Sequence, residues 1–94
     1  MSYALFLLGC ECGDLARVIR NDNKENRESD NFSSFWLATR NGHLYVVKFL
    51  DSTEARQFDD FSVVRVAMLN KHQKVVNYFV SVMSLEELSQ VFGK

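Results

Sequence analysis

The sequence predicts an all-α domain built from stacked helix-turn-helix repeats. A segment of the chain recurs at a fixed spacing, each copy places apolar residues on both sides of a tight turn, and the polar segments between the copies lack the alternation of a strand. Eight positions are identical in one fixed register. They are Asp30, Phe32, Ser33, Ala38, Asn41, His43, Val46 and Val47, which recur as Asp59, Phe61, Ser62, Ala67, Asn70, His72, Val75 and Val76.

A weaker copy lies upstream in the same register, where apolar, small and glycine positions coincide in kind. For example, Phe6, Gly13 and Val18 correspond to Phe35, Gly42 and Val47. The 94 residues allow one small domain. We therefore divide the chain into repeats at about residues 1–29, 30–58 and 59–83, followed by a C-terminal capping helix at about residues 84–92.

Each repeat is expected to hold two short antiparallel helices. In the middle copy the first spans about Ser34 to Arg40, Gly42 forms the turn, and the second spans about Leu44 to Leu50. The third copy has Lys71 in place of the glycine. We expect its neighbour Asn70 to take the left-handed conformation there, because asparagine tolerates it.

The connectors between repeats are polar. Asn21 to Asn31 contains no apolar residue, and we expect it to be a loop. Asp51 to Asp60 contains Ala55 and Phe58, and we expect a loop with one helical turn at Thr53 to Phe58. The last copy should extend its second helix by about a turn, and Ser84 with Glu87 predicts a capping box that begins the final helix.

Residues 37–50 read Leu-Ala-Thr-Arg-Asn-Gly-His-Leu-Tyr-Val-Val-Lys-Phe-Leu, which resembles the core of an ankyrin repeat. Residues 66–79 and 8–15 resemble it less closely. The period of 29 is shorter than the family's 33 or so, the chain has no proline, and the family's Thr-Pro-Leu-His opening and hairpin segment are missing. The resemblance therefore implies ankyrin-like repeats with degenerate connectors that lack β-hairpins. Divergent repeats of this kind, ending in a helix like the Ser-Leu-Glu-Glu-Leu segment here, resemble those of ankyrin proteins that intracellular bacteria deliver into host cells.

The resemblance implies a non-enzymatic module that binds a partner protein through the concave face of the stack. In the family the exposed end of each first helix and the connector before it contact the partner. The corresponding residues here are Glu11, Cys12, Asp30, Phe32, Arg40, Asn41, Asp59, Phe61, Leu69 and Asn70.

Three aromatic residues of these segments leave alternatives open. Phe32 and Phe61 are either exposed binding anchors or side chains tucked beneath the connectors. We expect Trp36 in the core, with exposure on the concave face as its alternative.

Composition and motifs exclude several other functions. A formal charge of −1 is too small to attract nucleic acid or an anionic membrane, and no segment has the 18 or so apolar residues that span a bilayer. No glycine-rich phosphate loop or nucleophile-elbow motif is present. We expect no enzyme activity, cofactor or metal site.

The histidines and cysteines are expected to be structural. Equivalent positions in adjacent repeats lie about 8–10 Å apart, too far for His43 and His72 to share a metal ion. Cys10 and Cys12 point to nearly opposite sides of a helix, so both thiols should stay reduced, as in the cytoplasm. For an effector delivered by bacteria this would be the host-cell cytoplasm.

A structural or assembly role is the alternative function. Two to three repeats leave apolar end faces open, so residues 1–8 or the Leu85 to Phe92 helix would dock on a second copy, forming a homo-oligomer, or on a neighbouring domain.

Overall fold

The computed structural model describes residues 2–93, which form seven α-helices and contain no strand. Met1, which belongs to the first predicted repeat, lies outside the described residues. The all-α class is confirmed. The helices are α1 (Tyr3–Cys12), α2 (Leu15–Arg20), α3 (Lys24–Arg40), α4 (Leu44–Leu50), α5 (Thr53–Leu69), α6 (Gln73–Val82) and α7 (Leu85–Phe92).

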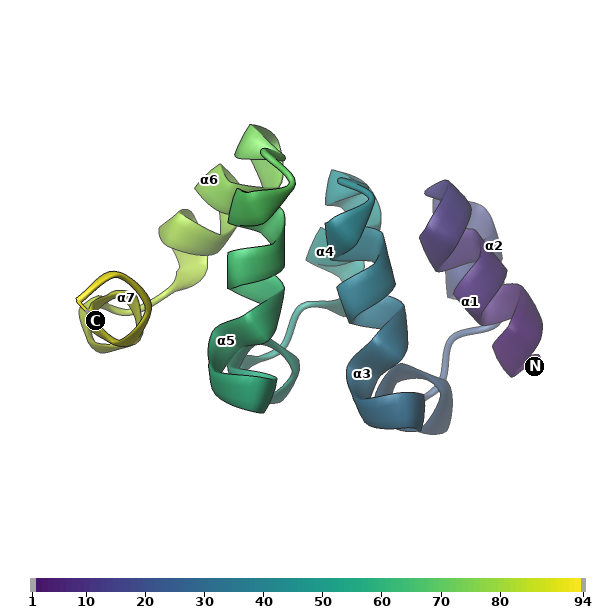
Figure 1. Cartoon of the computed structure of the whole chain (residues 1–94). Helices are drawn as coiled ribbons and strands as arrows, with labels where there is room; N and C mark the ends of the chain where they lie inside the picture. The colour runs from purple at the N-terminus through teal and green to yellow at the C-terminus, as the bar shows by residue number, and fades with distance from the viewer. Residues whose placement is uncertain (1, 94) are drawn as a thin grey trace.

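The helices form an elongated stack of antiparallel pairs. The first helices α1, α3 and α5 lie side by side in one layer, α2, α4 and α6 form a second layer behind them, and α7 lies at the C-terminal end (Figure 1). Helix α3 packs against both α1 and α5. The stack measures 40 × 22 × 18 Å and carries its two termini at opposite ends.

Five of the seven helices within residues 2–93 begin at a side-chain cap, whereas α4 and α6 do not. The side chains of Ser2, Asn23 and Ser52 accept hydrogen bonds from backbone N–H groups at the starts of α1, α3 and α5. At α7, Ser84 and Glu87 form the expected capping box. Helix α6 has ten residues and α4 has seven, so the predicted extension of the last copy is also confirmed.

Both connectors are helical, so the loop expected at Asn21 to Asn31 is wrong, whereas the helical turn expected at Thr53 to Phe58 is confirmed. Residues 24–28 and 53–57 form right-handed helix at the starts of α3 and α5. Each is followed by a short left-handed turn: φ is 54°, 57° and 61° at Asp30, Asn31 and Phe32, and 53°, 54° and 61° at Asp59, Asp60 and Phe61. The expectation that neither connector carries a strand is confirmed.

Polar contacts anchor both connector helices, and the second also buries Ala55. In the first, the buried Asn26 amide donates a 2.8 Å hydrogen bond to the carbonyl oxygen of Asn21, and Arg27 Nε lies 2.6 Å from Asp22 Oδ1. In the second, Arg56 Nη1 lies 2.6 Å from Asp51 Oδ1. Each arginine therefore ties a connector helix to an aspartate that lies just after the preceding helix, α2 or α4.

The histidine of the second repeat and that of the third each pack on the turn of the preceding repeat. Nε2 of His43 donates a 2.7 Å hydrogen bond to the carbonyl oxygen of Glu11, and Nε2 of His72 makes the same bond to Arg40. A carbonyl oxygen only accepts, so Nε2 carries the proton in both rings. The expected structural role of both histidines is confirmed.

The turn residues match this arrangement. Gly13 and Gly42 have φ values of 77° and 75°, and a Cβ on either would lie 2.5 Å from Nδ1 of the histidine that packs on it. In the third copy Lys71 has φ 59°, whereas Asn70 has φ −90°. The left-handed residue is therefore Lys71 and not Asn70. The hydrogen bond from His72 N to Ala67 O fixes this position, just as His43 N bonds to Ala38 O.

The core runs along the stack between the two helical layers. Ala38 and Ala67 are fully buried, as expected for positions where helices approach closely. The rings of Phe35 and Phe79 meet edge to face with centroids 6.0 Å apart. This core fixes the first helices side by side and so positions the surface that they expose.

Candidate functional site

The exposed ends of the first helices carry three different side chains at equivalent positions. Glu11, Arg40 and Leu69 occupy the same place in successive repeats and are all exposed, and Leu69 is 79 % exposed. We call these three residues the variable row. The backbone beneath the first two is alike, since Glu11 and Arg40 both accept a histidine hydrogen bond through their carbonyl oxygens. Their side chains are therefore acidic, basic and apolar on one repeated scaffold.

The side chains of the neighbouring asparagines bond to backbone carbonyl oxygens within the stack. Nδ2 of Asn41 donates to the carbonyl oxygen of Glu11 at 3.2 Å, and Nδ2 of Asn70 donates to that of Val66 at 2.9 Å. These bonds stabilise the turns that end α3 and α5. Cys12, the other predicted residue of this segment, is exposed with a free thiol.

The left-handed turns place the four remaining predicted residues. Asp30 and Asp59 are exposed. Phe61 is only 2 % exposed and belongs to the core, so of its two alternatives the tucked position is the one observed. Phe32 is half-buried, with its ring centroid 5.9 Å from that of Phe58.

Trp36 departs from the expectation of a core position. It is 38 % exposed, and the guanidinium of Arg40 lies 5.7 Å from its ring centroid. The reason is the helical period. Trp36 and Arg40 are four residues apart on the outer face of α3, whereas the adjacent Phe35 occupies the inner face.

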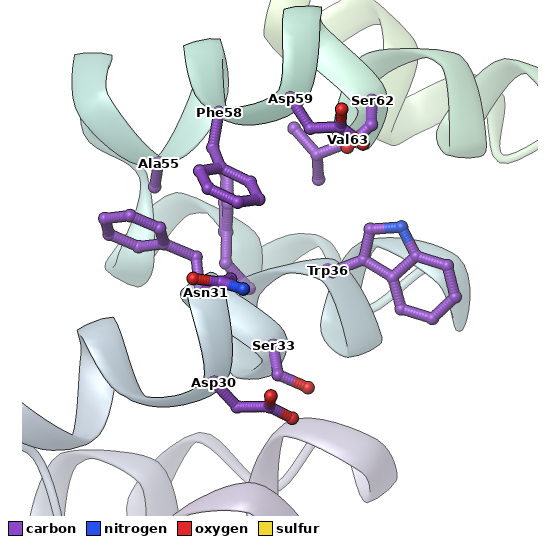
Figure 2. A pocket seen from close by; sticks show the side chains of 11 residues that line it. Asp30, Asn31, Ser33, Trp36, Ala55, Phe58, Asp59, Ser62 and Val63 are labelled. Carbon is purple, nitrogen blue, oxygen red and sulfur yellow. The ribbon is translucent and has the colours of Figure 1, made fainter.

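A groove of about 200 Å³ lies between α3 and α5, beside their left-handed turns. We call it the α3–α5 groove. Figure 2 shows the Phe58 ring reaching from α5 toward α3, with Asn31 and Trp36 on the opposite side. Among its lining residues are Asp30, Phe32, Trp36, Phe58, Asp59 and Ser62.

The groove brings together only part of the predicted set. Asp30, Phe32 and Asp59 line it, whereas the variable row lies at the far ends of the first helices. Sequence reasoning missed Phe58 as a surface residue, although it is 40 % exposed. The available signal was an aromatic residue in an otherwise polar connector.

The second unpredicted feature is a buried charge cluster where α7 meets the stack. Arg56 pairs with Asp51 and lies 3.5 Å from Glu87 of α7 through Nε, and the Tyr78 hydroxyl donates to Asp51 at 2.9 Å. Burial and this hydrogen bond raise the pKa of Tyr78 to about 12. The backbone N–H of Ser84, followed by Gln57 and Arg56, lowers the pKa of Glu87.

The signal for this cluster was present in the sequence. Asp22 and Arg27 recur as Asp51 and Arg56 in the register of the repeat, and Phe49 recurs as Tyr78. The Arg27 guanidinium lies 4.8 Å from the Phe49 ring centroid, so the two clusters have the same arrangement of arginine, aspartate and aromatic residue.

The two thiols differ in burial, since Cys12 is exposed and Cys10 is not. Cys10 is fully buried, and burial raises the pKa of its thiol to about 12, so it stays protonated and unreactive. Its expected packing role is confirmed.

Comparisons of the chain with known protein families, curated proteins and solved structures find no match. No helix within residues 2–93 has the length and apolar character needed to cross a membrane.

Proposed function

We propose that the chain is a non-enzymatic module of ankyrin-like repeats that binds a partner protein through the surface formed by its first helices. The variable row is the observation that carries this proposal. Where the repeats share their turns and hydrogen bonds, Glu11, Arg40 and Leu69 differ completely in chemistry and are all exposed. Positions that a repeat frees from packing are those at which recognition diversifies.

Two exposed aromatic residues of the first helices support the same surface: Trp36 lies beside Arg40, and Phe58 lies farther along the layer, at the left-handed turns. Trp36 and Phe58 present about two fifths of their area to solvent, at 38 % and 40 %. Large aromatic side chains and arginine are the commonest anchors of protein interfaces. The groups with a displaced pKa, such as Cys10 and Tyr78, lie in packing contacts away from this surface, which favours recognition over catalysis.

The two free thiols, Cys10 and Cys12, favour a reducing compartment. We therefore propose that the module works in the cytoplasm, which for an effector delivered by bacteria is that of the host cell.

The test compares the wild-type chain with two double variants in capture experiments quantified by mass spectrometry. R40E with L69D changes the variable row. K74E with L85D makes matched substitutions on exposed positions of α6 and α7. Surface changes of this kind move stability by less than about 0.5 kcal/mol, which circular dichroism melting would verify.

We expect R40E with L69D to retain less than about a tenth of the protein captured by the wild-type chain, because each interface anchor contributes about 2 kcal/mol or more. We expect K74E with L85D to retain most of it. If R40E with L69D folds and captures the same partner at wild-type levels, the proposal is wrong.

A second candidate function rests on the C-terminal end of the stack. Leu85 is 87 % exposed, Phe92 is 52 % exposed and Val82 is 41 % exposed. Apolar side chains at the end of a repeat stack favour self-association or docking on a neighbouring domain. Light scattering that gives a dimer mass for the wild-type chain and a monomer mass for K74E with L85D would favour this function.

A further inference from the structure

We infer that the α3–α5 groove receives an arginine side chain of the partner protein, with the guanidinium paired to Asp59 and stacked against exposed aromatic rings. This inference rests on the proposed function and adds the chemistry of one partner residue to it. The volume of the α3–α5 groove, about 200 Å³, is below the roughly 300–1,000 Å³ of pockets for drug-sized ligands. The groove therefore suits one inserted side chain.

The groove presents aromatic rings to its occupant. Phe58 is 40 % exposed and is braced by the tilted ring of Phe32, with centroids 5.9 Å apart. Trp36 lies on the other side of the groove (Figure 2) and holds the guanidinium of Arg40 5.7 Å from its own ring. A guanidinium therefore already packs on this indole within the chain. Planar guanidinium groups stack on aromatic faces better than ammonium groups do.

Asp59 supplies the complementary charge. It lines the groove, is exposed, and has no hydrogen bond or ion pair to any residue within 2–93. The adjacent Asp60 differs, because Arg65 Nη2 lies 3.6 Å from its Oδ2. A carboxylate can accept two parallel hydrogen bonds from a guanidinium. An arginine entering between the rings would thus find its charge partner at the edge of the groove.

Asp30 provides a matched control within the same chain. It occupies the equivalent repeat position and has nearly the same backbone, with φ 54° against 53° at Asp59. Asp30 lines the groove at its α3 edge, but its carboxylate points away from α5, on the side of α3 opposite Phe58 (Figure 2). Asparagine tolerates left-handed backbone as aspartate does, so D30N and D59N should both fold normally.

The experiment is an NMR titration of the labelled chain with acetylated and amidated peptides Gly-Ser-Ala-X-Leu-Ser-Gly, in which X is arginine, citrulline or glutamate. Citrulline keeps the shape of arginine without its charge. We expect the arginine peptide to shift the signals of Trp36, Phe58 and Asp59, with a dissociation constant on the order of 1 mM. Citrulline should weaken binding about three- to fivefold, and glutamate should abolish it.

The variants test which aspartate pairs with the arginine of the peptide. D59N should weaken binding of the arginine peptide about three- to fivefold, whereas D30N should leave it within about 1.5-fold. Equal affinity for arginine and citrulline peptides, an unchanged affinity in D59N, shifts confined to other surfaces, or no binding would each overturn the inference. The proposed function is judged separately, because it fails only if R40E with L69D still captures the partner.

Discussion

The middle and last repeats share one turn, yet their turn residues differ. Gly42 and Lys71 both have left-handed backbone, with φ 75° and 59°, and each donates its N–H to the residue three earlier, at 3.0 and 3.1 Å. Gly42 lies beneath the ring of His72, whereas the side chain of Lys71 is exposed. The glycine is therefore required mainly by the histidine of the following repeat, and less by the turn itself.

The two arginine clusters show the same contrast. The side chains of Arg27 and Asp22 are 33 % and 23 % exposed, but those of Arg56 and Asp51 are 6 % and 10 % exposed. Helix α7 and Tyr78 cover the second pair. Equivalent residues of two repeats therefore contribute differently to the free energy of unfolding, depending on which elements cover them.

The largest effect is expected at Arg56. R56A leaves Asp51 and Glu87 without their buried partner and should lower the free energy of unfolding by about 3–5 kcal/mol. The matched variant R27A breaks the more exposed pair and should cost about 1 kcal/mol. Urea denaturation measures both values. Equal losses in the two variants would contradict the contrast between covered and open clusters.

The next effect is at the covered turn. G42A adds a Cβ 2.5 Å from Nδ1 of His72 and places alanine at a φ of 75°, so it should destabilise by about 2–4 kcal/mol. K71A, which keeps a Cβ at the open turn, should change stability by less than about 0.5 kcal/mol. Thermal melting of the two variants provides the comparison. An unchanged melting temperature in G42A would contradict the claim that the His72 ring requires glycine at this position.

A smaller effect should appear at alkaline pH. The folded pKa of Tyr78, about 12, lies above its unfolded value of about 10, so the folded state holds this proton more tightly. The resulting stability is fully present below pH 10 and is lost as the pH rises to 12. Y78F should make this part of the stability profile less steep, and the slope that remains belongs in part to the buried Cys10 thiol, whose pKa is also raised to about 12. Y45F changes an exposed tyrosine and should leave the profile unchanged.

The smallest effect is a gain in stability at the open turn. K71G relieves the cost of left-handed backbone, about 1–2 kcal/mol, and loses about 0.5–1 kcal/mol to the entropy of the unfolded chain. The net result should be a stabilisation of about 0.5–1 kcal/mol, measured by urea denaturation. A loss of stability would mean that the Lys71 side chain makes contacts that the turn needs.

The sequence predicted the elements whose signals are local and periodic. The turn at Gly42, the capping box at Ser84 and the burial of Ala38 each follow from a residue type at a set spacing. The helical connector at residues 24–28 was missed because its stability comes from the Asn26 and Arg27 contacts, which a hydropathy pattern does not register.

The candidate surface was predicted less completely than the fold. Phe61 and Trp36 are both aromatic and fall in the same part of the repeat, yet one is 2 % exposed and the other 38 %. Trp36 faces outward because of the helical period, but the burial of Phe61 depends on the left-handed turn at Asp59, Asp60 and Phe61. Three consecutive non-glycine residues adopt this turn only because the surrounding packing holds them there. No local sequence rule predicts such a turn.

The most direct test of the binding surface is hydrogen–deuterium exchange of the chain, alone and with a partner protein captured by the wild-type module. The account predicts slower exchange at the C-terminal ends of α1, α3 and α5, at the variable row, and at the left-handed turns beside the α3–α5 groove, with α7 unchanged. Protection confined to α6 and α7 would contradict it and would place the interface at the end of the stack.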